Sequence, residues 1–425
     1  MKQLSLICLA AFSVVQAFAQ QSAAPVETKY RRSSIYTAMI DKPGLPYAEV
    51  IKKNFQDSPV PDKFDDHNLP VRIYDASLVN MDDKAAFSSM MSNLGTGAAP
   101  MDIPEMRDMQ AKFDNIAKEM VAKWFNRSAK GGFNMELIKQ RGSYDASVLD
   151  IATAKASKRG LDMLADAGEE LIKNTFFLVS DYKYVDKAEV AEKAKGWLNA
   201  IGTIGEYAGV SNASSVTTLA GEGVGVAGKG YVVKTTAYLY QLDWNEEVAA
   251  IFYNDMWADD ATITPERKKA FDDAQIFKLK FIGSDVSWSD VQSSVFSSKS
   301  EEELVQRAST KSLDAVIVKL QKNHDEFKTK TPLFTGEPIT AKIGMKEGVN
   351  EKSKFDVLEQ QMDENGKTKY VVVGSIKVDT SKPIWDNRFG ANEENPDTTT
   401  DRTHFKKVSG KEFYPGMLII QKKGK

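Results

Sequence analysis

The stretch "YVVKTTAYLYQL" (231–242) decides the fold of the middle of this chain. It is rich in valine, threonine and tyrosine, which favour β-strands. Successive side chains of a strand point to opposite faces of a sheet. Two sets alternate here: Val233, Thr235, Ala237 and Leu239 against Val232, Lys234, Thr236 and Tyr238. The pattern predicts a strand, and Asn245 with Glu246 would turn the chain into a second strand over 248–254.

Further segments of the same region predict strands and helices. "NTFFLVSDYKYV" (174–185) and "FKLKFIG" (277–283) are β-branched and aromatic, so both predict strands. Helical spacing occurs over residues 145–173 and 187–207. Ser300 with Glu303 forms a capping box that begins a helix continuing through Leu304, Leu313, Ile317 and Leu320.

The most regular helix pattern lies at "IPEMRDMQAKFDNIAKEMVAKWF" (103–125), where Pro104 suits the first turn. Its apolar residues recur every three or four positions: Met106, Met109, Phe113, Ile116, Met120 and Trp124. A stripe of methionine and aromatic residues could line a ligand groove, but an ordinary core face is the favoured interpretation. Residues 101–330 are therefore expected to form an α+β domain with helices on a largely antiparallel sheet.

The C-terminal part has a different sequence pattern, without long helical periodicity. "KTKTPLFTGEP" (328–338) is expected to be a linker, and short strand-like segments separated by turns follow it. "DENG" (363–366) is typical of a β-hairpin turn between two of them. Residues 335–425 are accordingly predicted to form a small all-β barrel or roll. A polar stretch at 390–402 is expected to be a mobile loop within it.

The N-terminus has the pattern of a secretory signal peptide over residues 1–19. Lys2 precedes an apolar run, and Ala17 and Ala19 form a small-residue cleavage site. Cys8, the only cysteine, lies within the run, so the mature chain would have no disulfide or thiol chemistry. We expect export to the periplasm or the outer-membrane periphery.

Residues 20–100 form a proline-rich N-terminal segment with few long periodic patterns. A strand is plausible near residues 70–75, where apolar residues alternate with polar ones. The sequence leaves open whether this segment folds alone or packs on the domain that follows.

The charge of the chain argues against a nucleic-acid partner, and its hydropathy argues against a transmembrane helix. The 425 residues carry a formal net charge of -3, which provides no strongly basic field for nucleic acid. After the signal peptide no segment approaches the ~20 continuous apolar residues of a transmembrane helix. The mature chain is therefore expected to have no transmembrane helix, although peripheral membrane association stays open.

The glycine-rich stretch "GEGVGVAGKG" (221–230) resembles a phosphate-binding loop. Such a loop needs a Ser or Thr after its lysine and a helix after that. Gly230 follows Lys229 here, and a strand-like segment comes next. The alternating glycines also lack the strand–turn–helix context of a dinucleotide site. We expect a flexible loop that binds no nucleotide.

Two acidic clusters are candidates for cation binding. "DKFDDHN" (62–68) gathers Asp62, Asp65, Asp66 and His67, and a solvated turn is the alternative to a metal site. "DMWADDATITPE" (255–266) is better explained by Thr264 and Pro265 starting a helix. Neither cluster has the ligand spacing of a known metal motif, so no metal or cofactor is predicted.

No catalytic residue can be nominated either. The chain has neither a G-x-S-x-G elbow nor an H-E-x-x-H motif. A pair of carboxylates suited to glycoside hydrolysis needs only to meet in space, so that alternative stays open. A platform for sugars or peptides could be built from tryptophans, although such residues more often pack in cores. The candidates are Trp244, Trp257, Trp288 and Trp385.

Several segments resemble known envelope proteins. "KIGMKEGVNEKSKFDVLEQ" (342–360), "VVVGSIKV" (371–378) and "YPGMLIIQ" (414–421) are similar to the small β-barrel module of flagellar assembly protein T. The helical pattern leading into "FFLVSDYKYV" (176–185) resembles curli-secretion-type periplasmic domains. Those transporters are lipidated, whereas this chain lacks a lipobox, so their pore role does not carry over.

"YRRSSIYTAMI" (30–40) and "PVPDKFDDHNLPV" (59–71) look like exported envelope proteins of Bacteroidetes, a likeness that implies no particular activity. The sequence thus favours an exported, non-enzymatic cell-envelope protein with a structural or protein-binding role in an outer-membrane-associated assembly. Its partners would be other envelope proteins. A secreted hydrolase with an unrecognised carboxylate pair and a carbohydrate- or ligand-binding protein are the alternatives.

Overall fold

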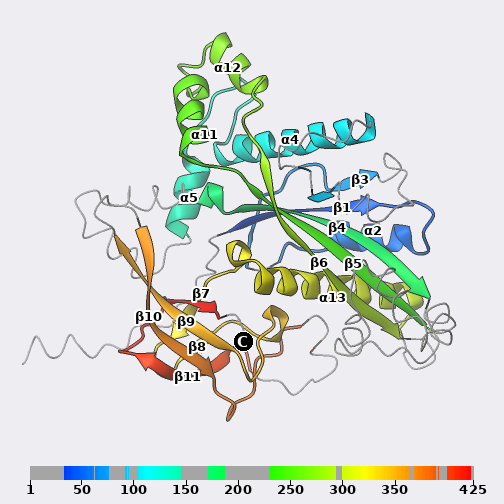
Figure 1. Ribbon diagram of the computed structural model, residues 1–425, viewed down its shortest axis with the longest axis vertical. Coiled ribbons are helices and arrows are strands. Elements are labelled where there is room, and N and C mark those ends of the chain that lie inside the picture. Colours follow the sequence, from blue (N-terminus) through cyan, green and yellow to red (C-terminus); the bar gives the residue numbers. More distant parts are fainter. Residues whose placement is uncertain are drawn as a thin grey trace, which may run out of the picture.

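The computed structural model describes residues 33–61, 63–75, 91–92, 94, 104–144, 171–186, 230–292, 299–362, 368–388, 391 and 400–422. Over these residues the chain forms a module of helices on a mixed sheet and, after it, a closed antiparallel β-barrel (Figure 1). The α+β class predicted from the sequence, with a barrel-like C-terminal part, is confirmed.

The sheet of the first module combines parallel and antiparallel pairing. Its strand order is β2-β1-β4-β5-β6, with β3 also paired to β1. Strand β1 runs parallel to β2, β3 and β4, whereas β5 pairs antiparallel with both β4 and β6. The strands are β1 (Ser34–Asp41), β2 (Asp65–Asp66), β3 (Ile73–Asp75), β4 (Thr175–Asp186), β5 (Gly230–Leu242) and β6 (Leu279–Gln292).

Helices cover both faces of this sheet. One face carries the long helix α4, and the other carries α13 together with α2, as Figure 1 shows. The remaining helices lie at one end of the sheet, where α12 is the outermost. The helices are α2 (Ala48–Asp57), α4 (Pro104–Trp124), α5 (Glu136–Tyr144), α11 (Glu246–Ile251), α12 (Pro265–Asp272) and α13 (Glu301–Asn323).

Strand β5 shows why the sheet is buried on both sides. Ala237 and Leu239 pack with residues of α13, whereas Tyr238 and Tyr240 pack with residues of α4. The predicted alternation is therefore confirmed. Thr235, on the α13 face, places its Oγ1 2.5 Å from Oγ of Ser312, so this buried polar pair is satisfied between sheet and helix.

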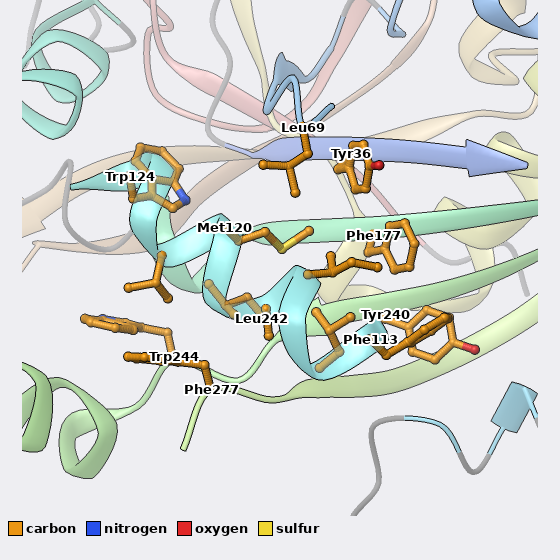
Figure 2. Packing of buried hydrophobic residues seen from close by; sticks show 14 of the residues in the cluster. Tyr36, Leu69, Phe113, Met120, Trp124, Phe177, Tyr240, Leu242, Trp244 and Phe277 are labelled. Carbon is orange, nitrogen blue, oxygen red and sulfur yellow. The ribbon is translucent and has the colours of Figure 1, made fainter. Parts of the chain in front are cut away.

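The face toward α4 is a large aromatic core (Figure 2). Phe113, Met120 and Trp124 of α4 are at most 1% exposed and pack with Phe177 and Tyr240 of the sheet. Each such side chain contributes roughly 1.5–3 kcal/mol when it leaves water. The prediction of a core face is confirmed for these side chains and for Ile116. The side chains of Met106 and Met109 lie outside the described residues.

The predicted strand over 248–254 is wrong. This segment is the helix α11 followed by a π-helical turn η3 (Phe252–Met256). The side-chain oxygen of Asn245 accepts a hydrogen bond from the backbone N–H of Val248 at 3.0 Å. Glu246 and Glu247 lie in the first turn, where the helix dipole favours negative charge. These capping residues outweigh the apolar run that resembled a strand.

The second module is a six-stranded barrel in the order β10-β11-β8-β7-β12-β9. A cluster of apolar residues fills its interior, among them Phe355, Ile376 and Ile419, each at most 1% exposed. Its strands are β7 (Thr331–Thr335), β8 (Thr340–Ala341), β9 (Lys354–Met362), β10 (Thr368–Val378), β11 (Thr403–Gly410) and β12 (Leu418–Gln421).

Two details of the barrel differ from the prediction. The expected linker over 328–338 contains β7, because Leu333 is a fully buried member of the barrel core. The first strand-like segment forms only β8, and a short 3₁₀ turn η6 (Met345–Glu347) follows it.

The hairpin predicted at 363–366 connects β9 and β10, which pair from Met362 opposite Thr368.

The question left open for residues 20–100 has a structural answer. Strand β1 lies inside the central sheet between β2 and β4, so part of this segment belongs to the first module. The strand expected near 70–75 is β3. The signal peptide, most of the helix pattern at 145–173, the pattern at 187–207, residues 221–229 and most of 390–402 lie outside the described residues.

Candidate binding site

The first acidic cluster does not come together as a group of ligands. Asp62 lies outside the described residues, and His67 is fully buried with Nε2 3.1 Å from the main-chain oxygen of Met120. Asp66 is exposed, and its Oδ1 accepts from the backbone N–H of Asn68. His67 therefore serves the packing of β2 against α4. No cluster of three or more metal-ligating side chains was found in the described part of the chain.

The second acidic cluster is a helix start, as its sequence indicates. Thr264 caps α12 by accepting from the backbone N–H of Arg267 at 3.3 Å, and Pro265 opens the helix. The carboxylate of Asp259 accepts from the hydroxyl and the backbone N–H of Thr262, and these hydrogen bonds lower its pKa. These contacts order the loop before the helix.

The tryptophans do not form a common platform. Trp244 and Trp257 both pack against Phe125 within the large aromatic core. Trp288 lies on β6 directly opposite Lys234, whose Nζ is 5.4 Å from the centre of its ring. Trp385 belongs to the barrel, where its main-chain oxygen accepts from the backbone N–H of Met345 at 2.9 Å. The described structure thus gives these residues packing and pairing roles.

The glycine-rich stretch leads into a strand. Residues 221–229 lie outside the described residues, but Gly230 begins β5. A phosphate-binding loop requires a helix at this point, because the helix N-terminus supplies the amides that hold the phosphate. The strand that was predicted to follow Lys229 is confirmed.

A cleft of about 1220 Å³ lies between the two modules. It is bounded by the C-terminal end of α13, the segment from η6 to the start of β9, and one end of the barrel. Pockets for small molecules typically have volumes of roughly 300–1,000 Å³. This cleft is larger and suits a longer ligand. We call it the α13–barrel cleft.

Lysines dominate the charge of the α13–barrel cleft. Lys328 and Lys422 form ion pairs with Asp325 and Asp356 at 2.6 and 2.7 Å. The other four lysines are exposed and pair with no carboxylate of the described residues. These four are Lys322, Lys352, Lys354 and Lys377.

The strand register of the barrel brings lysines into a row. Lys354 on β9 is the direct partner of Lys377 on β10, and Lys377 is the direct partner of Lys406 on β11. Neighbouring strands are about 4.8 Å apart, so three ammonium groups extend from one outer face of the barrel. Like charges placed directly opposite each other are destabilising. Only Lys406 has a described counter-ion, Asp379, at 2.8 Å.

Two ionisable groups in or beside the cleft have shifted pKa values. Partial desolvation, and next the neighbouring ammonium of Lys319, lower the pKa of Lys322. The hydrogen bond from Lys406 is the largest of the contacts that lower the pKa of Asp379, which the hydroxyl of Ser381 also contacts. A group that brings negative charge into the cleft would relieve the repulsion among the lysines without competing with the pair between Lys406 and Asp379.

The lining also contains apolar and amide groups. Val408, which is 56% exposed, lines it, whereas the lining barrel residues Ile376 and Ile419 are at most 1% exposed. Amide side chains of Gln321, Asn323, Asn350 and Gln421 also line it. The cleft therefore offers positive charge, an exposed apolar side chain, and groups that both donate and accept hydrogen bonds.

Direct contacts hold the two modules in this arrangement. Lys63 Nζ of the first module donates to the main-chain oxygen of Lys342 in the barrel at 2.7 Å. Asp314 of α13 is 4.0 Å from Lys346 of η6. The absence of a side chain at Gly348 lets η6 approach α13, because a Cβ there would lie 2.6 Å from Cγ1 of Val318. The cleft is thus part of the folded molecule before any ligand binds.

Sequence reasoning missed this site for a physical reason. Lys352, Lys354 and Lys377 resemble ordinary solvated lysines in the sequence, since nothing local marks them as neighbours. Only the pairing of β9 with β10 places Lys354 beside Lys377, and only the docking of α13 on η6 adds Lys322. The one usable signal was the spacing of Lys352 and Lys354, two residues apart at the start of a strand.

Comparisons with known proteins add no assignment. No family model matches the chain, and no curated protein matches it. Among the residues described by the structure, none of the helices has the length and apolar character needed to cross a bilayer.

Proposed function

We propose that this chain is an exported, non-enzymatic protein of the cell envelope whose role is to bind another envelope protein. The α13–barrel cleft is the site where that partner docks. The observation that carries this proposal is a preformed cleft, larger than a typical small-molecule pocket, between two modules in direct contact.

The composition of the cleft supports a protein partner. Apolar residues at the centre and charged residues at the rim are the usual arrangement of a protein-binding surface. Among the lining residues, Val408 has an exposed apolar side chain, and Glu351 and Lys352 have exposed charged ones. Preformed geometry also limits the ordering cost of binding, since the protein does not have to assemble the site.

Site-specific photo-crosslinking in the native envelope tests the proposal. A photoreactive residue replaces the exposed Glu351 in the cleft, and matched variants carry it at the exposed Lys139 on α5 or Lys369 on β10. We expect a discrete crosslinked product from position 351 that is absent at positions 139 and 369. The proposal fails if position 351 yields no product, or if all three positions yield the same one.

Export is tested separately. We expect the mature protein to begin at Gln20 and to be released with the periplasmic or outer-membrane fraction. Mass spectrometry of the N-terminal peptide from that fraction measures both. An uncleaved N-terminus in a cytoplasmic fraction would contradict the envelope assignment.

A further inference from the structure

We propose that the α13–barrel cleft binds an extended, acidic peptide segment of its partner, held by the lysines that converge there. This inference rests on the proposed function and adds the chemistry of the partner. Three independent features of the cleft support it: the register of its lysines, the amide groups beside them, and its concave shape.

The lysine row shows which charge the cleft attracts. Lys354 and Lys377 are direct cross-strand partners, and Lys352 lies two residues before Lys354. All three are exposed and unpaired among the described residues. Their mutual repulsion reduces the stability of the free protein, and carboxylates placed between them would remove that repulsion. The cleft therefore has a net preference for an anionic ligand.

The other polar groups favour a peptide over a denser polyanion. The side-chain amide of Gln321 can both donate and accept hydrogen bonds, as the main chain of an extended peptide requires. Phosphate groups only accept. Glu347 and Glu351 also line the cleft, and they would repel a ligand that carried negative charge at every position. A peptide in which acidic and apolar residues alternate would match this mixture of lysines, amides and carboxylates.

The shape of the cleft distinguishes a peptide from a membrane surface. The lining of this cleft includes Val408, whose side chain is 56% exposed. A flat layer of lipid headgroups can meet exposed lysines such as Lys352 but cannot fill a concave cleft. An extended chain, whose successive side chains point to opposite sides, can place apolar residues inward and carboxylates toward the lysines.

Binding of defined peptides to the purified mature chain tests the inference. The probe is a fluorescein-labelled decapeptide of alternating Glu and Val, compared with decapeptides in which Lys or Gln replaces Glu. Fluorescence anisotropy measures the dissociation constants. We expect the Glu peptide alone to bind measurably, and its affinity to fall as salt is added, because exposed ion pairs are screened.

Matched triple variants locate the binding. Lys352→Gln/Lys354→Gln/Lys377→Gln should weaken binding of the Glu peptide by about tenfold, since three exposed ion pairs are lost. Lys53→Gln/Lys130→Gln/Lys139→Gln changes the net charge equally at exposed positions outside the cleft and should leave affinity unchanged. All six side chains are exposed, so both variants should keep the unfolding midpoint of the parent, which circular dichroism checks.

The outcomes separate this inference from the function on which it rests. Equal binding of the Gln peptide, or an equal loss in both triple variants, overturns the acidic-peptide assignment. Binding of phosphatidylglycerol vesicles, with no binding of the Glu peptide, also overturns it and indicates a membrane surface. A partner crosslink at position 351 without peptide binding leaves the proposed function standing and rejects only the acidic segment.

Discussion

Gly374 on β10 and Gly410 on β11 lie directly opposite each other, and the ring of Phe413 packs against both. A Cβ added at Gly374 would stand 2.5 Å from the main-chain oxygen of Ser409 and 2.6 Å from Cζ of Phe413. The barrel thus closes at a point where two strands and an aromatic ring approach more closely than any side chain allows.

Replacing Gly374 by alanine should therefore destabilise the barrel. Overpacking of this kind typically costs about 1–3 kcal/mol. Urea unfolding of Gly374→Ala should show a lower midpoint than the parent, whereas Lys369→Ala, at an exposed position of the same strand, should stay close to it. Equal midpoints for Gly374→Ala and the parent would contradict the close approach of β10 and β11.

The burial of His67 predicts a dependence of stability on pH. Desolvation, and next the guanidinium of Arg141, lower the pKa of His67 to about 3. In the unfolded chain the imidazole takes up a proton below about pH 6.5. Protons therefore favour the unfolded state between these two values, and stability is lost as the pH falls from 6.5 toward 3. Between pH 7.5 and 5 this amounts to about 2 kcal/mol.

The variant His67→Gln isolates that contribution. Its amide can still donate to the main-chain oxygen of Met120 but cannot take up a proton. The free energy of unfolding of the variant should fall less between pH 7.5 and 5 than that of the parent, by about 2 kcal/mol. Parallel pH profiles for the two proteins would show that His67 titrates normally in the folded state.

A buried hydrogen bond joins α4 to the sheet. The indole N–H of Trp124 donates to Oγ1 of Thr175 at 2.8 Å, and both residues are fully buried. Thr175→Val keeps the shape but leaves the indole N–H without its acceptor, which should cost about 1–3 kcal/mol. Thr175→Ser retains the hydroxyl and should cost less. Thermal unfolding of both variants provides the comparison, and a milder effect of valine would reject this role.

The start of α13 depends on a capping box. Ser300 Oγ accepts from the backbone N–H of Glu303 at 3.2 Å, and the Glu303 carboxylate accepts from the backbone N–H of Ser300 at 2.7 Å. Ser300→Ala should lower the free energy of unfolding by about 1 kcal/mol, whereas Ser300→Asp should nearly preserve it, because aspartate is also a good N-cap. Identical losses in the two variants would mean that the cap contributes little.

The local features of the chain were largely readable from its sequence. The 3.6-residue spacing around Phe113 and Met120 predicted α4, and the alternation along 231–242 predicted β5. The capping residues Ser300 and Thr264 marked two helix starts. These signals are reliable because each depends on residues a few positions apart, whose propensities and hydrogen bonds act within one element.

Local signals failed where two of them competed or where pairing was distant. The segment after Asn245 carries both an apolar run and a helix cap, and the cap prevailed. Strand β7 looked like a linker because its burial depends on the barrel that forms around Leu333.

The candidate site belongs entirely to the tertiary structure. The sequence by itself determined the α+β class, the barrel-like end and most long elements, because hydrophobic periodicity selects which face of each element is buried. Only the tertiary structure brought β1 into the central sheet and placed Lys354 beside Lys377. Register and docking depend on contacts between residues distant in the chain, and a one-residue shift in pairing would move either lysine to the opposite face.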